Sequence, residues 1–390
     1  MDDVVLTAAD EYFHHQTVSS FEQVSTTDRN WTEKGYVVAY DTSGEVLIAV
    51  GVGKYTNRDV MDAFAGVAVP GRQWNVRASR ELRPDLDRTA VGPVVWEVER
   101  PPSRNRVMLM PNELDVSFDV TFESSFAPIV GRPGVRRDHG ITGNHTIRYF
   151  QPGQASGEVT VEGKTYRLDP ERSYAYKDRS WGIRAMTGVP NPGAFWFSDS
   201  TGRPEAGLRP SPDQPHGVLH GYLNFNFGSW ALSSTFTQGP DGRPVASSTG
   251  VSEGFVVFAG DSRPRLRITE LELDFEFWPS SRRARALHAH VGLEDGTTRD
   301  IQCTWRDLVY YFRGGGYFGY RGWWQGGYRG ALDVAGEALD LTDKATLDEL
   351  YGCEEIPVEC TCGDERGYGV MEPWAIGALP RYGITEDIVG

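Results

Sequence analysis

The stretch Tyr-Lys-Asp-Arg-Ser-Trp-Gly-Ile, from Tyr176 to Ile183, is the most informative part of this chain. It places the carboxylate of Asp178 beside the guanidinium of Arg179 and close in sequence to the indole of Trp181. Arg184 follows just beyond the glycine at position 182. An acid flanked by cations and a large aromatic ring is suited to handle charge on an apolar ligand. The stretch therefore predicts a ligand site, and the sequence on either side of it predicts the fold.

Alternation of apolar and polar residues predicts a chain made of β-strands. Leu114–Phe122 and Leu271–Phe277 alternate with the period of two that half-buried strands show. Gly157–Leu168 predicts a hairpin that turns at Glu162-Gly163. Other apolar segments are short and end at Gly, Pro, Asn or Asp, which is typical of barrels and sandwiches. We therefore expect an all-β fold.

The sequence predicts few helices and two domains of similar length. Thr342–Tyr351 begins with a capping threonine and carries an apolar stripe, and Ala8–Phe21 is a second candidate helix. A division is expected near Pro190–Gly193, which gives domains 1–188 and 189–390. At 390 residues the chain is long enough for two separate cores.

Composition excludes several classes of partner and cofactor. The net charge of -15 and the pI near 5.0 argue against nucleic acid and anionic membranes, which attract clustered positive charge. No apolar run approaches the ~18 residues of a membrane span, and Met1–Asp3 lacks a signal pattern, so we expect a cytoplasmic protein. The cysteines at 353, 360 and 362 do not have zinc-finger spacing, and no nucleotide or redox motif is present. We therefore predict no metal and no cofactor.

The D-x-x-W-G pattern at residues 178–182, near the middle of a strand-rich chain of about 400 residues, resembles a known signature. It is similar to that of the superfamily of bacterial carotenoid 1,2-hydratases, AttH-like proteins, and fungal kievitone hydratase and Diels–Alderase relatives. The resemblance implies two tandem lipocalin-like antiparallel β-barrels. It covers most of the chain in architecture, but in motif only residues 174–184 and, loosely, 367–374.

The resemblance also implies a role for Asp178. In the hydratases, the matching aspartate protonates a carbon–carbon double bond and water traps the cation. That acid must stay protonated near neutral pH, which burial favours, and Trp181 would stabilise the cation. Arg179 and Arg184 would tune the acid or hold a polar end of the substrate. The alternative is a structural ion pair of Asp178 with Arg179, since this chain has Arg179-Ser180 where the hydratases usually carry a histidine and a further acid.

Further candidates lie later in the chain. Glu372 is a second acid, two residues before Trp374, and the alternative is an exposed carboxylate at a sheet edge. His220 and Tyr222 are two residues apart, so on a strand they share one face and could form a proton shuttle inside a barrel. Two further aromatic residues complete the predicted substrate-binding set, Tyr176 and Trp196.

Residues 310–328 alternate aromatic side chains with glycines and carry only arginines as charged groups. We interpret them as a mobile aromatic flap over an apolar pocket, with Trp323 and Trp324 giving contact area. The alternative is a glycine-rich loop that packs onto the barrel or onto another subunit, which would be compatible with a homodimer.

Taken together, these features predict a cofactor-independent lyase or isomerase: a hydratase, dehydratase or cyclase. Its substrate would be an apolar small molecule such as an isoprenoid, steroid or polyketide. Two other functions stay open. One is a non-catalytic lipocalin-type carrier, in which Asp178 is structural. The other is a pericyclase that folds a polyene without a proton donor.

Overall fold

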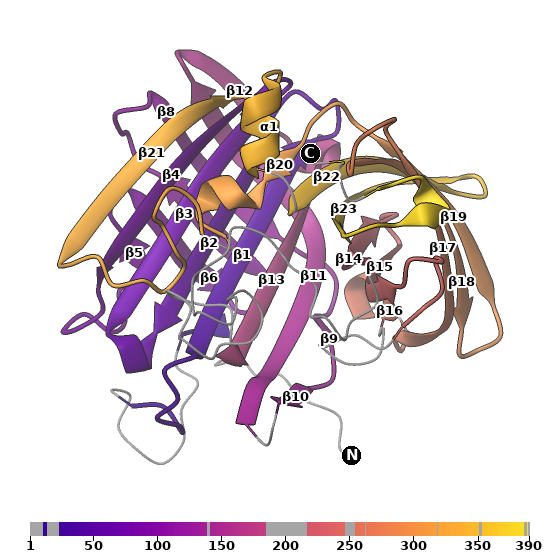
Figure 1. Cartoon of the computed structure of the whole chain (residues 1–390), viewed down its shortest axis with the longest axis horizontal. Helices are drawn as coiled ribbons and strands as arrows, with labels where there is room; N and C mark the ends of the chain where they lie inside the picture. The colour runs from indigo at the N-terminus through magenta and orange to yellow at the C-terminus, as the bar shows by residue number, and fades with distance from the viewer. Residues whose placement is uncertain are drawn as a thin grey trace.

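The computed structural model describes residues 11–13, 23–138, 141–184, 217–245, 254–261, 263–317, 319–350, 353–385 and 388. They form two antiparallel β-sheets that stand side by side, one at the left of Figure 1 and one at the right. The only α-helix within these residues is α1 (Lys344–Leu350), where the sequence predicts one. No described helix has the length and apolarity needed to cross a membrane. The other candidate helix, Ala8–Phe21, lies mostly outside the described residues.

The first sheet is a half-barrel that does not close on itself. Its strands follow the order β21-β4-β3-β2-β1-β13-β11-β8-β7-β6-β5, and three short strands pair with β11 off this path. The path strands are β1 (Trp31–Asp41), β2 (Leu47–Tyr55), β3 (Val60–Val69), β4 (Arg72–Glu81), β5 (Ala90–Val91), β6 (Val94–Arg100), β7 (Arg104–Leu109), β8 (Val116–Glu123), β11 (Ile141–Val161), β13 (Ser173–Arg184) and β21 (Leu332–Asp340). The short strands are β9 (Ile129–Val130), β10 (Gly134–Asp138) and β12 (Lys164–Leu168).

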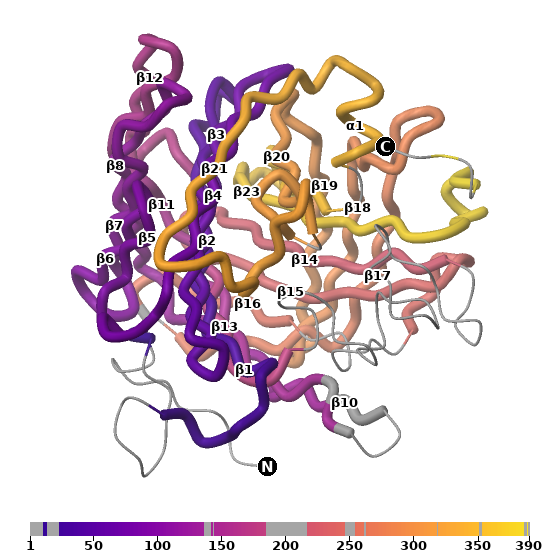
Figure 2. Tube along the Cα trace, turned by 60° about the vertical axis from the view of Figure 1, so that its left-hand side comes forward, coloured from indigo at the N-terminus to yellow at the C-terminus, as the bar shows by residue number. Residues whose placement is uncertain are grey.

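Strand β11 lets this sheet fold over into two layers. Its first part, Asn144–Gly153, pairs with β13, and its second part, Gln154–Val161, pairs with β8. Figure 2 shows the resulting layers at the left, with β6, β7 and β8 in one and β1 to β4 in the other. Between them lies an apolar core that includes Val37, Val50 and Trp96.

The second sheet closes into an eight-stranded antiparallel barrel. Pairing of β19 with β22 completes the ring β19-β18-β17-β16-β15-β14-β23-β22, and β20 adds to β22. These strands are β14 (Val218–Asn226), β15 (Trp230–Gln238), β16 (Gly254–Phe258), β17 (Leu266–Phe277), β18 (Ala284–Leu293), β19 (Thr298–Trp305), β20 (Tyr310–Tyr311), β22 (Glu354–Cys362) and β23 (Glu365–Ile376). A second apolar core, which includes Leu223, Ile301 and Met371, packs against these strands.

The predicted all-β architecture of tandem barrels is confirmed, with one closed barrel and one half-barrel. The two alternating segments form strands β8 and β17, whose apolar residues are the more buried ones. The hairpin turns at Glu162-Gly163 as predicted, with Val161 paired to Lys164. Both turn residues have positive φ, as a two-residue turn of type I′ requires. The predicted division at 188/189 falls outside the described residues and stays a prediction.

One strand crosses between the two halves of the sequence. β21 comes from the C-terminal half, yet it pairs with β4 along the whole stretch from Leu332↔Arg80 to Asp340↔Arg72. It therefore forms the edge of the half-barrel, as the orange strand at the left of Figure 1 shows. The segment that leads into β21, residues 312–331, is thereby drawn across the half-barrel and next to the seam between the sheets.

The seam between the two sheets is aromatic and holds a few buried hydrogen bonds. Strand β1 is buried on both faces. Its odd-numbered side chains pack in the half-barrel core, and its even-numbered side chains face the barrel. The hydroxyl of Tyr40 donates to the carbonyl of Gly369 at 2.8 Å, and that of Tyr174 donates to the carbonyl of Asn224 at 2.7 Å. The cavity described next opens in this seam.

Candidate active site

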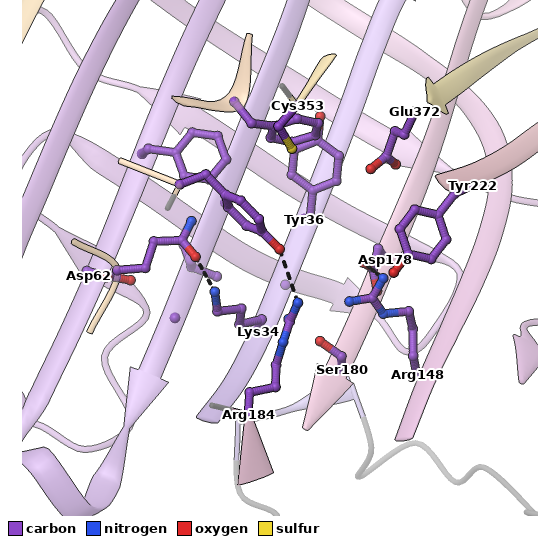
Figure 3. Close-up of a pocket in the computed structure, with 18 of the residues that line it drawn as sticks. Lys34, Tyr36, Asp62, Arg148, Asp178, Ser180, Arg184, Tyr222, Cys353 and Glu372 are labelled. Atoms are coloured by element: carbon purple, nitrogen blue, oxygen red, sulfur yellow. Dashed lines mark hydrogen bonds and ion pairs between the residues drawn. The ribbon is translucent and has the colours of Figure 1, made fainter. Parts of the chain in front are cut away.

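A cavity lies between strands β1, β2, β3, β11 and β13 of the half-barrel and strands β14 and β23 of the barrel (Figure 3). The space between its side chains is about 600 Å³, including the part open to solvent. Aromatic residues from both sheets line it, together with acids and cations. The lining residues that carry rings or charges are Lys34, Tyr36, Tyr55, Asp62, Phe64, Arg148, Tyr176, Asp178, Arg184, Tyr222, Phe312, Tyr317, Glu372 and Trp374.

Strand β13 carries Asp178 into this cavity. On a strand, alternate side chains point to opposite faces, so Tyr176, Asp178 and Ser180 line the cavity together. The odd-numbered side chains face the half-barrel core instead. There Lys177 forms an ion pair with Glu11 at 2.7 Å.

Two residues expected beside Asp178 therefore lie away from it. Arg179 is fully buried, its guanidinium lies 4.1 Å from the centre of the Phe13 ring, and it donates to the carbonyl of Lys34. Trp181 follows the same alternation, and it is absent from the cavity lining. The strand period places both side chains on the face opposite to the acid, although the charge of Arg179 still favours the ionised form of Asp178. The roles predicted for Arg179 and Trp181 stay predictions.

Asp178 meets a different cation, Arg148 of β11. The guanidinium Nη1 of Arg148 lies 3.5 Å from Oδ2 of Asp178, and the other carboxylate oxygen, Oδ1, is buried without a hydrogen bond. Burial raises the pKa of Asp178 above its usual value, while the charges of Arg148 and Arg184 oppose that rise. Burial and the cationic neighbours of Asp178 therefore act on its pKa in opposite directions.

Glu372 faces the same cavity from strand β23 of the barrel and is only 7% exposed. It is therefore not a carboxylate at an exposed sheet edge. Its Oε1 accepts a hydrogen bond from the hydroxyl of Tyr176. Burial raises the pKa of Glu372 to about 7, the hydrogen bond from Tyr176 opposes the rise, and the charge of Asp178 adds to it. Near neutral pH, Glu372 therefore holds a proton for much of the time.

A third acid stands behind these two. Glu355 of β22 is fully buried, and its Oε2 accepts a hydrogen bond of 3.3 Å from the hydroxyl of Tyr36. Burial and the nearby charge of Glu372 raise the pKa of Glu355 well above its usual value. Two phenols and two acids, Tyr176 with Glu372 and Tyr36 with Glu355, thus line one side of the seam.

His220 and Tyr222 share one face of β14, as their spacing predicts, but only Tyr222 lines the cavity. The His220 ring lies behind it, 5.6 Å from the Tyr222 ring and 5.7 Å from the Trp374 ring, with Nδ1 2.8 Å from the Thr237 hydroxyl. Burial lowers the pKa of His220 to about 4. The imidazole is therefore neutral at pH 7, and the rings of Tyr222 and Trp374 separate it from the cavity.

The segment 310–328 covers one side of the cavity, but not with the predicted residues. Phe312, Tyr317 and Gln325 line it. Trp323 instead packs against arginines outside the cavity, its ring 4.0 Å from the guanidinium carbon of Arg329, and Trp324 is not part of the lining. The last predicted aromatic residue, at position 196, lies outside the described residues. Whether the segment moves stays a prediction.

Sequence reasoning missed three charged residues of the cavity: Lys34 on β1, Asp62 on β3 and Arg148 on β11. They lie far apart in the sequence, so no local motif marks them. A weak signal exists in β2, where Gly51 and Gly53 alternate in an otherwise buried strand. A Cβ at Gly51 would lie 2.2 Å from the Phe64 ring, so glycine leaves room at the wall of the cavity.

Comparisons with known proteins place the chain in a family. A family model described as a family of unknown function (DUF8625) matches residues 6–385. No curated protein matches the chain.

Several solved structures resemble the chain at low identity. They include a putative AttH from Nitrosomonas europaea, with 16% identity, a TM-score of 0.46, and coverage of 90% of this chain and 93% of that one. Kievitone hydratase from Nectria haematococca has 12% identity, a TM-score of 0.40 and coverage of 87% and 88%. CghA has 10% identity, a TM-score of 0.41 and coverage of 90% and 89%.

Proposed function

We propose that this chain, a member of the family of unknown function DUF8625, is a cofactor-independent lyase or isomerase that acts by general-acid catalysis. The reaction would be a hydration, a dehydration or a cyclisation of an apolar small molecule of the isoprenoid, steroid or polyketide kind. One observation carries the proposal: two acids in different surroundings, Asp178 and Glu372, face the same aromatic cavity from two different sheets.

The two acids would divide the work of proton transfer. Glu372, with a pKa of about 7, holds its proton near neutral pH and is the better donor. Asp178 has more cationic neighbours, since the charges of Arg148, Arg184 and Arg179 all favour its ionised form. We therefore assign the acid role to Glu372, and give Asp178, the acid expected from the motif, the role of a carboxylate that stabilises positive charge or accepts a proton.

In a hydration, Glu372 would give its proton to one carbon of a carbon–carbon double bond, whose π electrons form the new C–H bond. The other carbon becomes a cation. The faces of Tyr36, Tyr222 and Trp374 would stabilise that cation, together with the charge of Asp178. A water oxygen then bonds to the cation and loses a proton to Asp178. Loss of a proton from carbon in place of water addition would give an isomer.

The cavity also has a polar end. Arg184 donates a hydrogen bond of 3.1 Å to the hydroxyl of Tyr317, and both line the cavity. A substrate with an oxygen-bearing end could place it there while its apolar part lies against the rings of Tyr222 and Trp374. An apolar wall with a few polar groups is the usual composition of small-molecule sites.

A carrier is the second candidate, because the same aromatic wall would hold an apolar ligand without chemistry. In a carrier, neutralising either acid leaves the bound compound unchanged. A pericyclase is a third candidate, and it would close a ring without transferring a proton from solvent to carbon. The predicted homodimer and cytoplasmic location stay predictions.

The experiment that separates these functions uses small-molecule mass spectrometry. Wild-type protein, Glu372→Gln and Asp178→Asn are each incubated, in H₂O and in D₂O, with an extract of the producing organism. Glu158→Gln is a control, since its side chain is 61% exposed on β11. The proposal predicts a product that differs from its precursor by water or by isomerisation and is lost in Glu372→Gln only or in both cavity variants. Where the reaction begins with protonation of a double bond, as in a hydration, the product also carries deuterium on carbon.

Other outcomes support the alternatives. The same unchanged compound released from all four proteins would support a carrier. A product without deuterium on carbon that is formed equally by Glu372→Gln would support a pericyclase.

A further inference from the structure

Lysine is rare in this chain. Of the 39 basic residues only five are lysines, at positions 34, 54, 164, 177 and 344. Lysine and arginine differ in one chemical respect that matters here: a lysine can lose its proton in a protein and act as a nucleophile, while an arginine cannot. A lysine kept inside a cavity where arginines supply the other positive charges is therefore a candidate for that role.

Lys34 is the one lysine that lines the cavity. Its position on β1 pairs with Gly53 of β2 and with Ser180 of β13, so only small residues flank it in the sheet. Its Nζ donates a hydrogen bond to Oε1 of Gln325 and lies 5.2 Å from the centre of the Tyr317 ring. Figure 3 shows Lys34 and Asp62 at one end of the cavity, away from Glu372 and Tyr222.

The two buried lysines, Lys54 and Lys177, have structural partners outside the cavity. Lys177 forms an ion pair with Glu11 in the half-barrel core, and both side chains are fully buried. Lys54 donates a hydrogen bond of 2.8 Å to the carbonyl of Phe13. Neither lines the cavity, so the half-buried Lys34 is the lysine that can meet a ligand there.

The surroundings of Lys34 favour its neutral amine. Burial and then the charge of Arg184 lower the pKa of Lys34 well below its usual value, and Arg148 acts in the same direction. Asp62 and Asp178 act against this shift but do not overcome it. An amine that is desolvated in an aromatic cavity and stands near other cations is the usual form of a lysine nucleophile.

Asp62 can supply the proton transfers that such an amine needs. Its Oδ2 accepts a hydrogen bond of 2.5 Å from the backbone N–H of Gly326. Burial raises the pKa of Asp62 to about 6, with Lys34 and that backbone hydrogen bond opposing the rise. At neutral pH a fraction of Asp62 is therefore protonated, at the same end of the cavity as the amine.

We infer that Lys34 is a nucleophilic amine that condenses with the carbonyl group of an apolar aldehyde or ketone bound in the cavity. The nitrogen lone pair forms a bond to the carbonyl carbon, the C–O π electrons move to oxygen, and a proton passes from the nitrogen to that oxygen to give a hydroxyl group. Asp62 protonates the resulting hydroxyl, which leaves as water, and a C=N bond to Lys34 takes the place of C=O. No electrons leave or enter the system, so no external oxidant or reductant is needed.

The inference rests on the proposed function in one respect, because both place a substrate in the same cavity. It adds a substrate class, a carbonyl compound. An iminium link would anchor the substrate at the Lys34 end of the cavity and withdraw electrons from the carbons next to it. Protons on those carbons would become more acidic, and the carboxylates of Asp178 and Glu372 in the same cavity could accept them.

The test is reductive trapping followed by peptide mass spectrometry. Full-length protein is incubated with cinnamaldehyde, an apolar aldehyde, and sodium cyanoborohydride, which reduces an imine to a stable secondary amine. Label at each of the five lysines is measured at pH 7 and at pH 9. The exposed lysines, Lys344 with a side chain 79% exposed and Lys164 in a hairpin strand, are internal controls in the same sample.

The expected result is at least tenfold more label on Lys34 than on Lys344 at pH 7. Between pH 7 and pH 9 the ratio of Lys34 label to Lys344 label should fall by about tenfold or more, because an ordinary lysine with a pKa of about 10.4 gains roughly 100-fold in neutral amine over that range. Lys34→Arg keeps a long basic side chain but removes the nucleophilic amine, and it should lose the label at position 34 only.

Label on Lys164 and Lys344 with none on Lys34, or with no preference for it at pH 7, would overturn the inference and leave Lys34 as a structural ammonium that holds Gln325. The outcome is independent of the acid chemistry. If Lys34 is labelled but Glu372→Gln converts substrate as well as the wild-type protein does, the proposed function fails and the amine stands. If Lys34 stays unlabelled while Glu372→Gln loses conversion, the reverse holds.

Discussion

Tyr176 of the half-barrel donates its hydroxyl hydrogen bond to Oε1 of Glu372 in the barrel. The pair joins the two sheets at the cavity. Within its own sheet, Tyr176 of β13 is paired with β1, and Glu372 of β23 is paired with β14. A phenol that donates to a carboxylate favours the ionised form of that acid, which opposes the effect of burial. The position of Tyr176 therefore sets how readily Glu372 gives up its proton.

Replacing Tyr176 by phenylalanine should raise the pKa of Glu372 further, because the hydrogen bond that opposes its rise is lost. The basic limb of the pH profile of kcat/KM, which reports loss of the Glu372 proton, should move to higher pH by roughly 1 unit. Tyr174→Phe is the matched control, since its hydroxyl also makes a buried hydrogen bond but outside the cavity. Equal shifts in the two variants would mean that the Tyr176 hydroxyl does not act through Glu372.

Glu372→Gln should stabilise the fold at high pH. A glutamate whose folded pKa, about 7, exceeds its unfolded value binds its proton more tightly when folded. Its contribution to stability is therefore present at pH 4 and is lost as the pH rises through 7. Against the wild type, the variant should gain about 1–3 kcal/mol in free energy of unfolding at pH 8 relative to pH 4.

Urea unfolding at both pH values measures this difference. Glu158→Gln, on an exposed carboxylate, should show no such dependence. A Glu372→Gln variant whose free energy of unfolding differs from that of the wild type by the same amount at pH 4 and pH 8 would contradict the raised pKa.

Arg148→Met should shift the acidic limb of the pH profile. Arg148 is the largest influence that keeps Asp178 ionised against burial, so its loss should raise the pKa of Asp178 further. If ionised Asp178 is required, the acidic limb of kcat/KM should move up by roughly 1 unit or more. Arg167→Met, at a side chain that is 81% exposed, serves as the control. An acidic limb that stays in place would remove Asp178 from the mechanism.

Gly51→Ala should fill the cavity wall. The new Cβ would lie 2.2 Å from Cε1 of Phe64, so that ring, which lines the cavity, must shift. The expected cost in free energy of unfolding is about 1–3 kcal/mol, the usual range for an overpacked core. Ligand retention should fall with it. A double variant, Gly51→Ala with Phe64→Leu, makes room again and should recover retention; if it does not, the glycine serves the strand and not the ligand.

The sequence predicted the architecture because strand alternation, the turn at Glu162-Gly163 and the short helix near Lys344 are local properties of the chain. The assignment of β21 to the half-barrel is not local, since it depends on a pairing with β4 about 260 residues away. No pattern within residues 332–340 specifies that partner.

The candidate site was predicted in part for the same reason. Asp178 and Glu372 were recognised from their aromatic and glycine neighbours. Arg179 and Trp181 were expected beside Asp178 because they are close in sequence, but on a strand the period of two places them on the far face from it. Lys34 and Arg148 meet Asp178 only because β1, β13 and β11 lie side by side.

The central claim is that Glu372 is an acid whose pKa lies near 7, so that it keeps its proton through the mildly acidic range. Infrared difference spectroscopy of wild-type protein minus Glu372→Gln isolates the stretch of its protonated carboxyl group, with no substrate required. The account predicts that this band disappears with a midpoint near pH 7, and at higher pH in Tyr176→Phe. A band already lost at pH 5, close to the ordinary glutamate value of about 4.3, would contradict the account.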